Sequence, residues 1–141
     1  LNSRTEYSSP VQIPGTTWSS LSSGSYQGMG IKTDGTLWVW GNNGKGQLGQ
    51  NDVAQRSSPV QIPGTTWSDA LAQSSWVAAL KTDGTIWAWG QNASGSLGQN
   101  NVTQYSSPVQ VGSGTGWNLD KLPNGGRGQL TGLAFLKEAL N

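Results

Sequence analysis

One phrase of twenty residues occurs twice in the chain, and this duplication constrains the fold more than any other feature. KTDGTLWVWGNNGKGQLGQN spans residues 32–51, and KTDGTIWAWGQNASGSLGQN spans residues 81–100. The segment SSPVQIPGTTWS recurs with the same offset of 49 residues, at residues 8–19 and 57–68. A constant offset of this length indicates tandem copies of one structural unit.

The two copies set the predicted domain organisation. One unit covers residues 7–55, the next covers residues 56–104, and a partial third unit at residues 105–117 starts with SSPVQV before the pattern ends. We therefore expect repeats over residues 1–117. Residues 118–141 carry no copy of the repeat and contain the run PNGG, so we expect a turn-rich tail there.

One stretch of the tail has helical spacing. Its leucines recur at intervals of three and four residues, which places them on a single face of a helix. They are Leu130, Leu133, Leu136 and Leu140. We predict a short C-terminal helix that either caps an open blade face or docks against another subunit, and the sequence leaves both roles open.

Each unit is predicted to form short antiparallel strands. In the first unit they are residues 18–23, 27–32 and 36–41, with a fourth short strand at residues 11–13 between two prolines that confine it to a sheet edge or a strand end. An Asp-Gly pair between the second and third strands predicts a hairpin turn, because glycine tolerates a positive φ. The pairs are Asp34-Gly35 and Asp83-Gly84.

Four short antiparallel strands in roughly fifty residues are typical of one β-propeller blade. The composition agrees, because 21 Gly and eight Trp with few charges suit many strands joined by tight turns. We therefore predict an all-β fold, a partial β-propeller of about two to three four-stranded antiparallel blades.

Two tryptophans lie in the third strand of each copy. They are Trp38, Trp40, Trp87 and Trp89. Residues two apart on a strand point to the same face, so Trp38 and Trp40 share one face while Leu37 and Val39 share the other. Because both faces are apolar, we expect the tryptophans to pack between neighbouring blades. A platform on which sugar rings stack is the alternative.

A glycine-rich segment, GNNGKGQLGQN, follows the third strand. It predicts a turn that passes close to other backbone, with one leucine as an apolar anchor. The positions are Gly41, Gly46, Leu48 and Gly49, and in the second copy Gly90, Leu97 and Gly98. No helix is predicted to follow, so the segment does not fit a phosphate-binding loop of the Walker type.

The Asp-Gly, Trp-Gly and Leu-Gly pairs at these spacings resemble the repeat of the regulator-of-chromosome-condensation family. The resemblance implies a ring of β-blades, and family functions that range from nucleotide exchange on a small GTPase to chromatin contact and scaffolding. The resemblance also implies that the residues of these Asp-Gly, Trp-Gly and Leu-Gly pairs have structural roles in the blade. The family often has His before the hairpin, where this chain has Gln27 in one copy and Trp76 in the other. Because the copies differ there, these two are the candidate binding residues.

The composition argues against several classes of function. The net charge is +1 and 11% of residues are charged, which is no electrostatic footprint for nucleic acid. The chain has no Cys and no His, and its seven acidic residues form no recognisable pair. We therefore expect no catalytic residues, no metal site, no cofactor and no enzyme activity. No apolar run approaches the ~20 residues of a membrane span.

Two units and a fraction cannot close a ring of blades. Asn2 aligns with Asn51 and Asn100, so the first complete unit follows the end of another. Open blades expose edge strands and an apolar face. We expect a fragment of a longer polypeptide, ahead of an assembly of several copies or a recipient of a partner's strands.

Three functions are compatible with these features. The favoured one is a structural or protein-interaction module in a virion or extracellular surface assembly such as a phage tail, because the Ser-, Thr-, Asn-, Gln- and Gly-rich repeats resemble those of bacteriophages. The second is a glycan-binding adhesin that uses an exposed Trp76. The third is a cytoplasmic regulator of the exchange-factor type. The expected partners are proteins or glycans and not nucleic acid.

Overall fold

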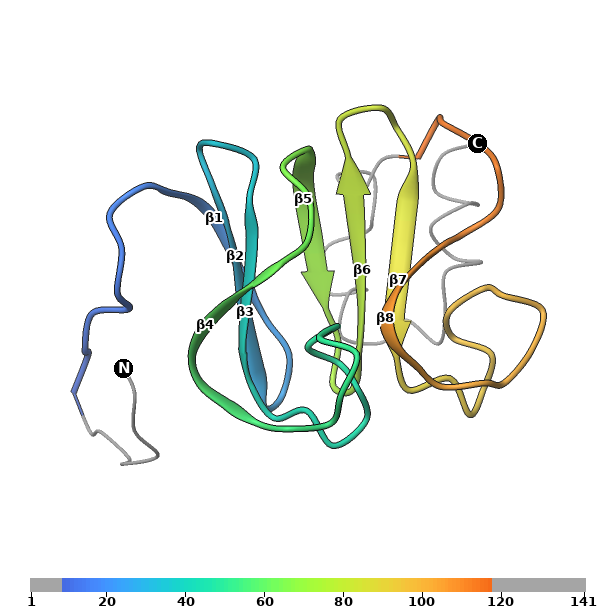
Figure 1. Ribbon diagram of the computed structural model, residues 1–141, viewed down its shortest axis with the longest axis horizontal. Coiled ribbons are helices and arrows are strands. Elements are labelled where there is room, and N and C mark those ends of the chain that lie inside the picture. Colours follow the sequence, from blue (N-terminus) through green and yellow to red (C-terminus); the bar gives the residue numbers. More distant parts are fainter. Residues whose placement is uncertain (1–8, 118–141) are drawn as a thin grey trace.

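A computed structural model describes residues 9–117, which form two four-stranded antiparallel sheets and no helix. Figure 1 shows the two sheets side by side. The first contains β1 (Trp18–Ser23), β2 (Gln27–Lys32), β3 (Leu37–Gly41) and β4 (Arg56–Ile62). The second contains β5 (Trp67–Ala72), β6 (Trp76–Lys81), β7 (Ile86–Gly90) and β8 (Tyr105–Gln110). The predicted all-β partial propeller is confirmed, whereas the predicted C-terminal helix lies outside the described residues.

The hairpin turns form where the Asp-Gly pairs predict them. Gly35 has a φ of 83° and Gly84 a φ of 84°, a conformation that favours glycine. The Asp34 carboxylate accepts hydrogen bonds from the Thr36 amide at 3.0 Å and the Thr36 hydroxyl at 2.6 Å. Asp83 makes the same two bonds in the second sheet. The aspartate side chain therefore stabilises the turn by hydrogen bonds, in addition to the backbone conformation that glycine supplies.

The outer strand of each sheet comes from the following repeat unit. The predicted strand at residues 11–13 is wrong, because those residues form no strand. Their copy, residues 60–62, belongs to β4, which pairs with β3 through Leu37 opposite Ile62. Residues with this sequence form a strand where a strand such as β3 comes before them in the chain and pairs with them. Among the described residues none precedes residues 11–13.

The core lies mainly between the two sheets. We call one side of each sheet its aliphatic face and the other its tryptophan face. The aliphatic face of the first sheet, with the leucine of its loop, contributes Met29, Ile31, Leu37, Val39, Leu48 and Ile62 to this core. The tryptophan face of the second sheet contributes Trp67, Ala72, Val77, Ala79 and Trp89. The predicted division of β3, with Leu37 and Val39 on one face, is confirmed.

The aliphatic face of the second sheet forms a second core cluster. Five of its members are 49-residue copies of residues in the first set, and Leu71 and Trp76 are added near the strand ends. The full set is Leu71, Trp76, Ala78, Ile86, Ala88, Leu97 and Val111. The two sheets are thus stacked in one direction, and each presents the same kind of face to the same side.

Candidate interaction face

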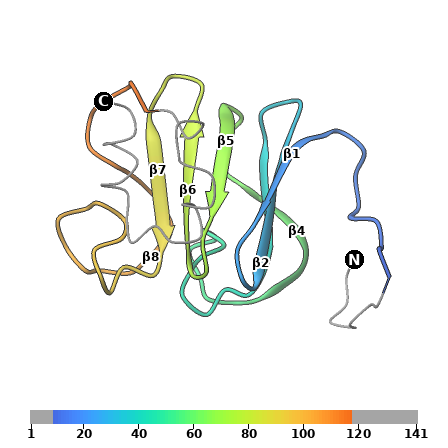
Figure 2. The same cartoon turned by 180° about the vertical axis from the view of Figure 1, so that it is seen from behind.

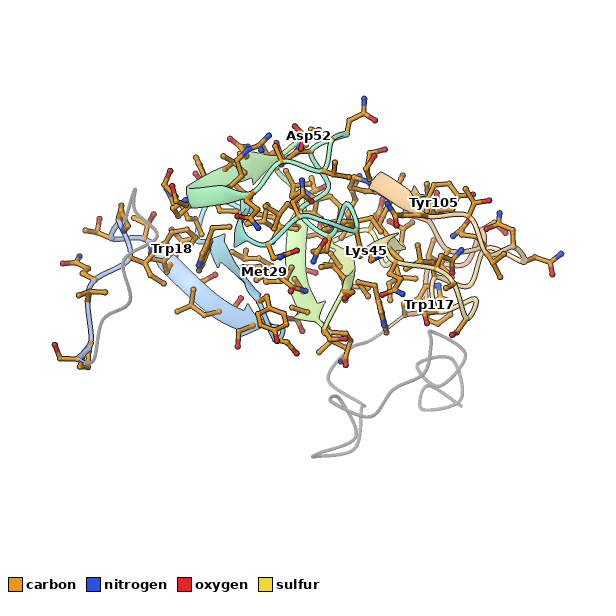
Figure 3. The ribbon with its side chains drawn as sticks, turned by 90° about the horizontal axis from the view of Figure 1, so that it is seen from below. Trp18, Met29, Lys45, Asp52, Tyr105 and Trp117 are labelled. Carbon is orange, nitrogen blue, oxygen red and sulfur yellow. The ribbon has the colours of Figure 1, made fainter. Side chains whose placement is uncertain are left out.

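The tryptophan face of the first sheet is uncovered by any strand of residues 9–117. We define it by Trp18, Leu21, Gly28, Gly30 and Trp40, which the strand pairing places on one side. Figures 1 and 2 show only the loop before β1 beyond this sheet. In Figure 3, Trp18 lies on the outer side while Met29 lies between the sheets. This face is the outer surface of the stack.

The face carries an open apolar groove of about 550 Å³. Leu21 is 59% exposed and Tyr26 is 74% exposed, and both line the groove together with Trp40. The polar groups along it are serine hydroxyls, the Gln27 amide, the Trp40 indole N–H and backbone. No carboxylate or amine side chain lines the groove. An exposed apolar surface of this kind is typical of an interaction site.

Two glycines shape this face. A Cβ atom added to Gly28 would lie 2.5 Å from the Trp40 ring, and one added to Gly30 would lie 2.7 Å from the Trp18 ring. The two indoles therefore rest directly on the backbone of β2. Their ring centroids are 6.0 Å apart at 61°, an edge-to-face arrangement. The result is a shallow aromatic platform beside the exposed Leu21.

The copy of this face in the second sheet shows what the face can pack against. Trp89 is fully buried against the first sheet, and its indole N–H donates to the Gln47 carbonyl at 2.9 Å. Trp67 pairs with Trp89 at 6.2 Å and 64°. The prediction that tryptophans pack between blades is confirmed for Trp89. Trp40 has the same position in the first sheet but is only half-buried, because no described sheet precedes it.

A lysine lies over two indole rings in each sheet, an arrangement that sequence analysis missed. The Lys32 ammonium is 5.2 Å from the Trp18 ring centre and 4.3 Å from that of Trp38. Lys81 repeats the contact with Trp67 at 4.9 Å and with Trp87 at 4.3 Å. The Trp38 and Trp87 indoles donate within their own sheets, to Thr36 and Thr85. A sequence signal for this contact was available, because both copies of the repeated phrase begin with a lysine.

The two predicted binding residues are buried at equivalent ends of the aliphatic faces. Gln27 is 4% exposed, and its amide donates to the Gln73 carbonyl of the second sheet. Trp76 is 6% exposed in the second core cluster. The expectation that Trp76 is exposed is therefore wrong, because it packs against apolar neighbours. The large exposed apolar residues of the groove are instead Leu21 and Tyr26, which differ between the copies.

A buried asparagine organises each glycine-rich loop, and sequence analysis did not single it out. The Asn43 carbonyl accepts from the Leu48 amide at 2.9 Å. Its NH₂ group donates to the Asp52 carbonyl, the Asp52 carboxylate and the Ala54 carbonyl at 2.9–3.0 Å. Asn92 makes the corresponding bonds in the second loop. The bonded loop holds Leu48 in the core, as the apolar-anchor prediction requires.

Acid is expected to loosen the hairpin turns. Hydrogen bonds from the Thr36 and Thr85 hydroxyls, and then from their amides, hold the pKa of Asp34 and Asp83 below its ordinary value. Their contribution to stability is present above the unfolded-state pKa, about 3.9, and is lost as pH falls through the lower folded-state pKa. Melting temperatures should therefore fall on acidification from about pH 6 to about pH 2.5.

The matched variant for this prediction is Asp34→Asn combined with Asp83→Asn. Asparagine keeps an acceptor oxygen for the threonine amide but carries no titratable group. The double variant should show a smaller decline in melting temperature on acidification than the parent chain. The same decline in both proteins would show that the turn carboxylates do not cause it. Asp52, whose pKa is lowered chiefly by its hydrogen bond from Arg56, titrates in both.

The stacked sheets and their 49-residue repeat define the class of β-propeller repeat proteins. The model of the regulator of chromosome condensation (RCC1) repeat matches residues 34–71 and 83–117, and a second model of this repeat matches residues 18–47. The chain belongs to this repeat family. None of the curated proteins compared with the chain matches it.

Three solved structures share the fold. Human WBSCR16 is 18% identical with a TM-score of 0.63, over 72% of this chain and 26% of that one. Yeast RCC1 (Prp20) bound to Kap60 is 15% identical with a TM-score of 0.63, over 73% and 26%. Prp20p from Saccharomyces cerevisiae, whose structure was reported with its binding to Gsp1p and histones, is 15% identical with a TM-score of 0.61, over 73% and 27%. The chain spans about a quarter of the length of these proteins.

No helix within residues 9–117 has the length and apolar character needed to cross a membrane. No group of three acidic, His or Cys side chains in this part of the chain is arranged to hold a metal ion.

Proposed function

We propose that the chain is a non-enzymatic protein-interaction module that binds a protein through the tryptophan face of its first sheet. One observation carries the proposal: this face is open, while Trp67 and Trp89, the copies of Trp18 and Trp40 in the second sheet, are buried against the first sheet. An apolar face of this kind, rimmed by polar residues, is typical of a protein interface. The few charges and the Ser-, Thr- and Asn-rich repeats favour a virion or cell-surface assembly, of bacteriophage or bacterial origin, as the setting.

Site-specific photo-cross-linking tests this proposal. A benzophenone amino acid at Leu21 should form covalent adducts with a protein in the organism that makes the chain, because Leu21 is exposed within the groove. The matched control is Val53, which is 57% exposed on the loop after β3 and does not line the groove. Position 53 should give no such adduct. Absence of a protein adduct at position 21, or the same adducts at both positions, would contradict the proposal.

Glycan binding is a second candidate, because Tyr26 and Trp40 place two aromatic rings on the same groove. Sugar rings stack on exposed aromatic faces, and the serine hydroxyls beside Tyr26 are suitable hydrogen-bonding groups. Binding should quench tryptophan fluorescence when a glycan panel is titrated, and Tyr26→Ala should weaken that binding. An unchanged emission across the panel would rule this candidate out.

A further inference from the structure

We infer that Asn43-Gly44 is a deamidation site, at which the buried asparagine amide is converted to a carboxylate when the glycine-rich loop of the first sheet opens. This site is independent of the open face of the proposed function. Three features point to it: the Asn-Gly pair itself, the hydrogen bonds that the closed loop makes with it, and its less reactive copy in the second sheet.

Deamidation requires that the backbone nitrogen of the following residue reach the side-chain carbon of an asparagine, a chemically labile residue. The Gly44 nitrogen attacks the Asn43 Cγ and loses its proton. A succinimide ring forms while the Cγ–N bond breaks and ammonia leaves. Water then opens the ring at either carbonyl, which gives aspartate or isoaspartate. Glycine is the most reactive residue at the second position, because it has no Cβ to obstruct ring closure and its backbone is the least restricted.

The closed loop holds every group that would react. The Gly44 amide, which is the nucleophile, donates to the Asn42 side-chain oxygen at 2.9 Å. The Asn43 backbone carbonyl belongs to the same peptide group and accepts from the Gly46 amide at 2.9 Å. The leaving NH₂ group of Asn43 donates to three oxygens of the loop, and the side chain has no exposed surface. Because ring closure turns this peptide group and breaks these bonds, the reaction proceeds from an open loop.

The second loop has the same hydrogen bonds around a less reactive pair. Its buried asparagine, Asn92, bonds as Asn43 does but is followed by Ala93. The alanine Cβ obstructs ring closure, so Asn92 should react more slowly than Asn43 once both loops are open. The other Asn-Gly pair of the sequence, Asn124-Gly125, lies outside the described residues.

Either product prevents the first loop from closing as it did before. Aspartate places a negative charge against the oxygens that the NH₂ group contacted, and isoaspartate lengthens the backbone by one carbon. The Asn43 side-chain oxygen holds the amide of Leu48, which is buried between the sheets. The neighbouring Gln47 carbonyl accepts the Trp89 indole N–H of the second sheet. Deamidation at Asn43 therefore weakens the contact between the two sheets irreversibly.

Peptide mapping measures how far the closed loop protects the site. The full chain is incubated in mildly alkaline buffer, with and without urea that unfolds it. Mass spectrometry then follows the tryptic peptide of residues 33–45, and fragmentation locates the changed residue. Conversion at Asn43 should be at least roughly tenfold slower without urea, which corresponds to about 1.4 kcal/mol of loop-opening free energy. Any smaller difference would show that the loop does not protect Asn43 and would overturn the inference.

Gly44→Ala is the matched control, because it gives the first loop the dipeptide of the second. A Cβ on Gly44 would meet one atom of residues 9–117, the Asn42 side-chain oxygen, at an ordinary contact distance of 3.5 Å. In urea the variant should convert at Asn43 several-fold more slowly than the parent, at a rate close to that of Asn92. This comparison does not depend on folding. An unchanged rate would contradict the assignment of the Asn43-Gly44 pair.

Removal of the urea tests whether the reaction is irreversible in its effect on the fold. Parent chains converted at Asn43, separated by ion exchange and refolded, should melt at least roughly 4 °C below unreacted parent. Gly44→Ala kept in urea for the same time should regain its original melting temperature. It retains Asn124-Gly125, so any effect of reaction there is common to both proteins. A converted chain that melts like the parent would show that the loop closes around the product and would overturn the inferred loss of contact.

Discussion

Replacing Trp89 by alanine is expected to lower the free energy of unfolding by about 3–5 kcal/mol, the usual range for a fully buried aromatic residue. Trp89 has no exposed surface, packs edge-to-face against Trp67, and donates its indole N–H to the Gln47 carbonyl. The substitution removes all these contacts and leaves a cavity between the two sheets. It also leaves the Gln47 carbonyl without this donor.

Trp40→Ala is the matched control, because Trp40 has the same position in the first sheet but is only half-buried. Its loss should cost less than about 2 kcal/mol. Urea unfolding followed by circular dichroism measures both variants against the parent chain. If the two substitutions cost the same, the tryptophan faces are equally covered and the open face has been wrongly assigned.

The second large effect is expected from Asn43→Asp, which should lower the free energy of unfolding by about 3–5 kcal/mol at neutral pH. Asn43 is completely buried, and its NH₂ group donates to the Asp52 carboxylate and to the carbonyls of Asp52 and Ala54. An aspartate would place a negative charge against these three oxygens. The loop would then have to open or leave the charge unpaired.

The neighbouring residue offers a close control for this substitution. The Asn42 side chain uses its oxygen, which accepts from the Gly44 amide at 2.9 Å and from the Gln47 amide group at 3.1 Å. Asn42→Asp keeps that acceptor, so its cost should stay below about 0.5 kcal/mol. Urea unfolding of the two variants compares them directly. Similar losses would mean that charge alone, and not the direction of hydrogen bonding, determines the effect.

The regular parts of the fold could be predicted because local signals determine them. The predicted strands at residues 18–23 and 27–32 coincide with β1 and β2, and the third differs by one residue at its start. Glycine in the hairpins and the alternation along β3 are local properties that need no knowledge of neighbours. The positions of Leu48 and Leu97 in the core followed from the same repeat.

The errors arose where a residue's surroundings depend on another unit. The SPVQI segment has the same sequence at residues 9–13 and 58–62, yet only the second copy lies in a strand, because pairing needs a preceding β3. Trp40 and Trp89 also share a local sequence pattern and differ in burial for the same reason. The difference at Gln27 and Trp76 was visible in the sequence, but their burial depends on contacts with neighbouring strands.

The outer strand that closes each sheet comes from the following repeat unit, and this affects how such a chain can change in length. The closing strand has nearly the same sequence in successive units, as SSPVQI in β4 and SSPVQ in β8. Loss of residues 56–104 by recombination would therefore join β3 to a strand equivalent to the one removed. Whole repeats could be gained or lost in this way, and each surviving sheet would still have four strands.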